Sequence, residues 1–184
     1  MTRWPYDVLD VLCLKVNLRR MSVLPHVATV EDVPPEVALW TSKYAQLLLW
    51  PILSATSIGI RGQADRGQEW FDDVLAAAET GRRRPVDGYL VLALTIPPIA
   101  EEANVIRELQ RSTQVCRKHA IWPDPADNTG WHGLLDVTIL GLPDEVLPTS
   151  DADWPSLDSE ANAVWRRVDD LGYNAAARGD IEEI

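Results

Sequence analysis

The sequence predicts an α/β fold, a single compact domain in which a mixed or mostly parallel sheet is flanked by helices and followed by a C-terminal helix. Two apolar runs, residues 47–53 and 89–96, are typical of strands that are buried on both faces. Amphipathic helical patterns follow both runs. We expect residues 1–143 to form the core domain. Residues 144–184 are expected to form an acidic linker, the C-terminal helix and a tail, packed on or next to the core.

Residues 5–18 are mostly apolar and allow two interpretations. The alternation of apolar residues between positions 12 and 18 predicts a strand, whereas Val8, Leu12 and Lys15 have helical spacing and predict a helix just before it. Short apolar runs fit both structures, so the sequence leaves the choice open.

The next segment combines a predicted helix start with a predicted strand. Residues 32–36 contain two prolines, which are typical of a first helical turn, and Trp40 could continue one face of such a helix. Residues 47–53 are better explained by a buried strand, and we expect this strand to end at the turn-prone segment 59–62.

Residues 65–79 show the clearest helical pattern in the chain. Asp65 and Gln68 match a capping box at its start, and Gly81 is in the position favoured for a helix end. Apolar residues recur at helical spacing on one face: Trp70, Phe71, Val74, Leu75 and Ala78.

A strand–helix–strand unit follows. The strand at 89–96 leads through two prolines into a helix at 99–112, and residues 115–122 form the next strand. A crossover of this length predicts two parallel strands. The buried face of the helix is expected to carry Ile99, Ala103, Ile106 and Leu109.

Two further elements complete the predicted fold. Residues 131–140 predict another strand, and residues 156–171 predict the C-terminal helix, which Gly172 ends. Its apolar face contains Leu157, Ala161, Val164, Trp165 and Val168.

The net charge of −11 is concentrated in the last third of the chain. Residues 1–122 contain 14 acidic and 14 basic residues, whereas residues 123–184 contain 14 acidic residues and only three basic ones. Such a surface attracts a basic partner and repels nucleic-acid phosphates, so independent DNA binding is disfavoured. A solvated face that keeps the protein soluble explains the same charge.

Cys116 lies beside three potential cations, Arg117, Lys118 and His119. Neighbouring cations lower the pKa of a cysteine and increase its reactivity. Adjacent residues of a strand point to opposite faces, however, so Cys116 is expected to face away from Arg117 and His119. We therefore expect a buried structural thiol.

We expect no catalytic residue, no metal site and no cofactor. The sequence has no P-loop, no metal-binding histidine pair and no nucleophile elbow. Asp87 is placed like the first acid of a restriction-type nuclease, but no acid-x-Lys pair follows on a neighbouring strand. An active site assembled from distant residues stays open.

The middle of the chain carries a resemblance to a known family. A strand at 86–94, the acidic pair Glu101 and Glu102 on the next helix, and the pair Arg117 and Lys118 opening a hydrophobic strand resemble the middle-component proteins of bacterial ABC-three-component systems. The resemblance covers residues 86–142, and the acidic C-terminal region has no counterpart in it.

The resemblance implies a small accessory subunit of an antiphage defence system of the Lamassu kind. Such a subunit binds, bridges or regulates an SMC/ABC-type ATPase and an effector such as a nuclease. It has no active site of its own and contacts DNA, if at all, only through the complex. The alternative hypothesis, which rests on the charge, is an acidic immunity or inhibitor protein that neutralises a basic toxin or nuclease.

Partner-binding residues are expected in two regions, the strand after the acidic helix and the acidic linker. Two isolated cysteines, the absence of a signal peptide and the absence of a membrane-spanning stretch predict a cytoplasmic protein with no membrane role. The eight tryptophans suit both a core and a partner-binding surface. The candidate partner-binding residues are Arg117, Lys118, Trp122, Asp144, Glu145, Asp151, Asp153 and Trp154.

Overall fold

The structure is a computed structural model that describes residues 4–27, 32–54, 56–80, 85–141 and 158–171. It contains a six-stranded mixed sheet. The strands lie in chain order in the sheet. They are β1 (Arg19–Arg20), β2 (Ala38–Thr41), β3 (Ala45–Ile52), β4 (Asp87–Leu94), β5 (Arg117–Pro123) and β6 (Trp131–His132). The strands β3, β4 and β5 are parallel, and the other neighbouring pairs are antiparallel. The α/β fold with a mixed sheet is confirmed.

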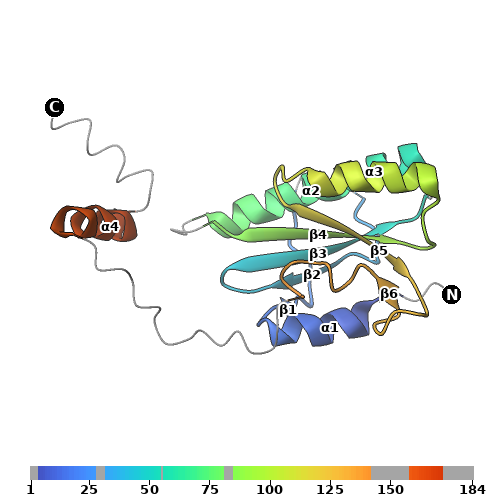
Figure 1. The fold of residues 1–184 in the computed structure, drawn as a ribbon, viewed down its shortest axis with the longest axis horizontal. Helices are drawn as coiled ribbons and strands as arrows, with labels where there is room; N and C mark the ends of the chain where they lie inside the picture. The colour runs from blue at the N-terminus through green and yellow to red at the C-terminus, as the bar shows by residue number, and fades with distance from the viewer. Residues whose placement is uncertain (1–3, 28–31, 55, 81–84, 142–157, 172–184) are drawn as a thin grey trace. The chain divides into compact units, whose positions relative to one another are not determined.

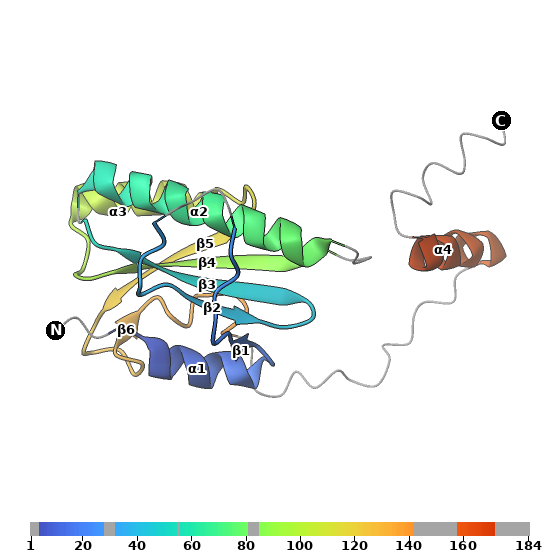
Figure 2. The same ribbon diagram turned by 180° about the vertical axis from the view of Figure 1, so that it is seen from behind.

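Helices cover both faces of the sheet (Figures 1 and 2). The helices α2 (Ser57–Glu79) and α3 (Ala100–Arg111) connect the parallel strands and lie on one face, while α1 (Tyr6–Lys15) lies on the other. The connection from β5 through β6 to residue 141 lies on the same face as α1 (Figure 1). The predicted parallel strand–helix–strand unit is present as β4, α3 and β5.

Alternate side chains of the central strands fill two separate core layers. On β3, Leu48 and Trp50 pack beneath α2 and α3, whereas Leu47 and Leu49 pack on the α1 side. Close packing on Trp50 requires a glycine in α2, because a Cβ atom on Gly67 would lie 2.8 Å from Cγ of the indole. The buried strand predicted at 47–53 is confirmed.

The start of α2 corrects two predictions. The helix begins at Ser57 and not at Asp65, because the hydroxyl of Thr56 accepts a hydrogen bond of 3.1 Å from the backbone of Gly59 and caps it. The turn predicted around Gly59 is therefore helical. Glycine is needed there for close approach, since a Cβ atom would lie 2.1 Å from the hydroxyl oxygen of Ser54.

The helix start predicted at 32–36 is also wrong. Trp40 lies in β2 with none of its surface exposed, and its indole nitrogen donates to Asp10 at 2.7 Å. A short turn joins β2 to β3, in which the hydroxyl of Ser42 accepts hydrogen bonds from the backbone of Tyr44 and Ala45. Burial of β2 between the two core layers explains why the extended conformation is preferred here.

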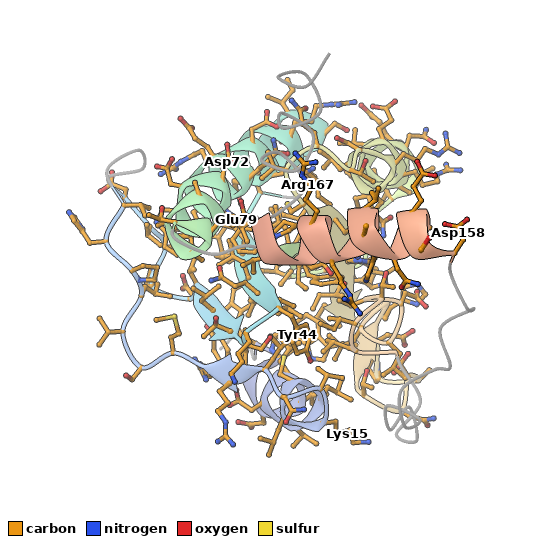
Figure 3. All side chains as sticks on the ribbon, turned by 90° about the vertical axis from the view of Figure 1, so that its left-hand side faces the viewer. Lys15, Tyr44, Asp72, Glu79, Asp158 and Arg167 are labelled. Atoms are coloured by element: carbon orange, nitrogen blue, oxygen red, sulfur yellow. The ribbon has the colours of Figure 1, made fainter. Side chains whose placement is uncertain are left out.

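At the N-terminus the helical interpretation is correct and the strand interpretation of positions 12–18 is wrong. Leu9 and Cys13 lie one helical turn apart on α1, and both are buried against the sheet. The hydroxyl of Tyr44, labelled in Figure 3, donates to the carbonyl of Val16 beyond the helix end. The β2–β3 turn thereby contacts the segment that follows α1.

Two smaller differences concern the later elements. Ile99 precedes α3 with 66% of its surface exposed, so it does not join the buried stripe, and Val105 is buried instead. Of the strand predicted at 131–140, only the first two residues form β6. Gly133 then turns the chain with a φ angle of +77°.

The chain divides into two units. The first contains all the strands of the described residues and α1 to α3, and the second contains α4 (Ser159–Leu171). The C-terminal helix is thus present, and it begins after Asp158, whose carboxylate accepts a 2.8 Å hydrogen bond from the backbone of Ala161 (Figure 3). The packing of this segment on the core stays a prediction.

Candidate protein-interaction surface at the carboxyl end of the sheet

Arg117 is the first residue of β5 and is exposed at the amino end of the strand. Its guanidinium donates a 2.9 Å hydrogen bond to the hydroxyl of Tyr89 and lies 5.5 Å from the centre of that ring. The neighbouring tyrosine holds the cation in place without burying it, so Arg117 remains accessible to a partner.

Lys118 has a different environment from its neighbour. Only 3% of its surface is exposed. Its ammonium donates to the backbone carbonyls of Gln114 at 2.9 Å, Ser112 at 3.3 Å and Cys116 at 3.5 Å. These carbonyls lie in the connection between α3 and β5, which Lys118 therefore stabilises while offering little surface to a partner.

Trp122 lies at the other end of β5 and is partly buried. Its indole stacks on the ring of His132, with ring centres 4.2 Å apart. At the strand rise of about 3.3 Å per residue, Arg117 and Trp122 are roughly 17 Å apart. Their side chains also point to opposite faces of the sheet, so the structure does not bring the predicted β5 residues into one site.

The other predicted partner-binding residues lie outside the residues that the structure describes. They are Asp144, Glu145, Asp151, Asp153 and Trp154.

Four exposed aliphatic residues lie at the end of the sheet where β3 and β4 end, and sequence reasoning missed them. We call Leu53, Ile58, Ile96 and Ile99 the aliphatic patch. Their exposed fractions are 59%, 87%, 54% and 66%, respectively. Large aliphatic side chains gathered on a surface mark an interaction site more often than single exposed ones do.

The topology brings these four residues to one end of the sheet. Leu53 follows β3 and Ile96 follows β4, and the two strands are paired up to their last residues. Ile58 lies in the first turn of α2 and Ile99 directly precedes α3. The starts of both helices lie at this same end (Figure 1). The hydroxyl of Ser57 donates to the carboxylate of Glu101 at 3.4 Å, which links the two helix starts.

The sequence did contain a signal for this patch. Ile58 follows the helix cap Thr56, and Ile96 and Ile99 flank two prolines, so these aliphatic residues occupy loop and first-turn positions that usually carry polar side chains. The carboxyl ends of parallel strands are also where α/β proteins commonly bind their ligands.

The two thiols are buried, as expected for Cys116. Burial raises the pKa of Cys116 to about 11 and that of Cys13 to about 12. The thiolate is the reactive form, so these groups are poor nucleophiles at neutral pH. Cys116 packs with Ala120 beneath α2 and α3, away from Arg117, as the strand alternation predicts.

His119 is the one histidine of β5. Burial lowers its pKa, and within the described residues its Nε2 atom has no hydrogen-bond partner.

Among the described residues there is no group of three potential metal ligands. No described helix has the length and apolar character needed to cross a membrane. Searches against family models, curated proteins and solved structures found no match to this chain.

Proposed function

We propose that this chain is a non-catalytic accessory subunit that binds another protein through the aliphatic patch. The observation that carries the proposal is the exposure of four large aliphatic side chains at one end of the sheet, led by Ile58 at 87%. Burying a Leu or Ile side chain contributes about 1.5–3 kcal/mol, so a partner that covers the patch gains substantial free energy.

The resemblance of residues 86–142 to middle-component proteins suggests the identity of the partners. We propose an SMC/ABC-type ATPase and an effector subunit of a cytoplasmic antiphage defence complex, with DNA contacted only through the assembled complex. In this assembly the chain bridges or regulates its partners. Arg117 is accessible for such contacts at the opposite end of the sheet from the patch.

Co-expression with the products of neighbouring genes tests the proposal. The full chain is expected to co-elute with a coiled-coil ATPase or an effector in size-exclusion chromatography. Ile58→Asp should weaken that complex by at least about tenfold, because a charge then replaces the most exposed apolar side chain of the patch.

Val23→Asp is the matched control for this variant. Val23 is 75% exposed in the connection between β1 and β2, on a different part of the molecule. An acid in the first turn of a helix is favourable, so Ile58→Asp should fold normally. Equal binding by the wild-type chain and Ile58→Asp would contradict the proposed role of the patch.

The charge distribution favours the second candidate function, an acidic immunity or inhibitor protein. The whole excess of −11 lies after residue 122, which suits a small basic toxin or nuclease. In that case the product of the adjacent gene is a basic protein. Its affinity for this chain should fall steeply as the salt concentration rises.

A further inference from the structure

An open pocket of about 380 Å³ lies where β4 and β5 begin, at the opposite end of the sheet from the aliphatic patch. Residues 86–88 at the start of β4 form one wall, and residues of the connection from α3 to β5 form the other. The backbone of Asp87 donates to the carbonyl of Tyr44 at 2.9 Å, which fixes the first wall (Tyr44 is labelled in Figure 3). A pocket of this size has room for a side chain of a partner.

The second wall contains a strained turn. Val115 has a φ angle of +67°, which β-branched residues rarely adopt, and the backbone of Cys116 donates to the carbonyl of Gln114 across it at 2.8 Å. The ammonium of Lys118 donates to the same carbonyl at 2.9 Å, so the buried lysine holds this turn. Backbone strain of this kind is found mainly where it serves a functional site.

Two side chains of opposite charge line the pocket, Asp87 and Arg117. Within the described part of the chain they form no ion pair with each other or with a third residue. Arg117 donates to the hydroxyl of Tyr89 and has further N–H donors, whereas the carboxylate of Asp87 can only accept. The hydroxyl of Thr113, in the same lining, can do either. A ligand that meets both charged groups must therefore offer an acceptor and a donor.

The other charges near the pocket are mixed in sign. The carboxylate of Glu79 accepts from the backbone of Val86, and the ammonium of Lys118 donates to backbone carbonyls, so both already have partners. Three arginines, residues 82–84, precede Val86 in the sequence, but they lie outside the described residues and are no part of the site. The surroundings therefore give no reason to expect a ligand of one charge.

We propose that this pocket binds the side-chain amide of an asparagine or glutamine residue of a protein partner. The amide oxygen accepts from Arg117 and the amide nitrogen donates to Asp87, so both charged groups keep a hydrogen-bond partner when they lose water. A ligand with a single charge satisfies one of them and faces a like charge on the other. The inference rests on the proposed function for the ligand being part of a protein, and it adds the chemistry which that partner presents to this end of the sheet.

Titration of the full chain with N-acetyl-glutamine methylamide, followed by NMR shifts, tests the pocket. N-acetyl-methionine methylamide is the control probe, because it has a similar length and the same backbone groups without the side-chain amide. We expect saturable shifts at Gly88, Cys116 and Arg117 with the glutamine compound only, and little change in affinity with salt, because the ligand is neutral. Equal shifts with both compounds, or no saturable shift with either, would overturn the proposal.

Two variants examine the roles of the charged lining residues. Arg117→Met and Asp87→Ala should each weaken binding of the glutamine compound about three- to tenfold, because each removes one hydrogen bond to a charged group. The matched controls are Arg19→Met on β1 and Asp65→Ala on α2, two exposed residues on other elements, and both should bind like the wild-type chain. Unchanged affinity in correctly folded Arg117→Met and Asp87→Ala chains would contradict the assignment.

Three further arms separate the possible ligands and the two proposals. Tighter binding of N-acetyl-glutamate methylamide than of the glutamine compound would show an anion site and overturn the amide. Tighter binding of free glutamine would overturn the assignment to a protein side chain. The Ile58→Asp variant should bind the glutamine compound like the wild-type chain. Loss of complex formation in that variant therefore reports on the aliphatic patch, and loss of glutamine binding in Asp87→Ala reports on the pocket.

Discussion

Replacing Lys118 by methionine is expected to lower the free energy of unfolding by about 1.5–3 kcal/mol, the range for a hydrogen bond to a charged group. The ammonium is buried and donates to three backbone carbonyls, of which those of Gln114 and Ser112 are the closest, at 2.9 and 3.3 Å. Methionine fills similar space but donates no hydrogen bond. The carbonyls near the surface regain water, which keeps the loss within the range for one charged interaction.

Urea unfolding followed by circular dichroism measures this loss, and Arg117→Gln is the control. Arg117 is exposed and its guanidinium donates to the hydroxyl of Tyr89, so its replacement should cost less than about 1 kcal/mol. The slope of the urea dependence should stay constant in both variants. If Lys118→Met is as stable as the wild-type chain, the three carbonyl contacts do not stabilise the α3–β5 connection and the reasoning is wrong.

Three further predictions concern the core. Gly67→Ala should destabilise the fold by about 1–3 kcal/mol in urea unfolding, because the new methyl group meets the ring of Trp50. The two buried thiols should react with a thiol reagent at neutral pH only slowly in the folded chain and quickly in denaturant. Burial lowers the pKa of His119 from 6.5, so the folded chain resists protonation and the free energy of unfolding should fall as the pH drops below that value. The His119→Leu variant should show a weaker pH dependence over this range.

The parallel part of the sheet is predictable from the sequence because its strands are buried on both faces. Such strands appear as continuous apolar runs, as at residues 47–53 and 89–96, and the length of each connecting segment predicts a helical crossover. The antiparallel part was missed at 32–44. There Trp40 fits a helical stripe as well as a strand, and only its pairing with β3 decides between them.

The glycines of α2 show a second limit of sequence reasoning. In the sequence, Gly59 is typical of a turn and Gly67 is typical of a residue that destabilises a helix. In the structure, Gly59 lets the helix approach Ser54 closely and Gly67 lets it approach Trp50. That requirement arises only when the helix is placed on the sheet. The burial of Lys118 also depends on the folded structure. Its positive charge indicates a surface residue, but its ammonium donates hydrogen bonds to backbone carbonyls of the α3–β5 connection.

The residues of the aliphatic patch differ from the core residues, because each of them has more than half of its surface exposed. Leu53, Ile58, Ile96 and Ile99 lie at chain positions where serine, threonine or an acid would cap a helix or solvate a loop at least as well. Neither core layer includes any of the four. Four exposed aliphatic residues outside both core layers, at one end of a sheet, support the proposal that another protein covers this surface.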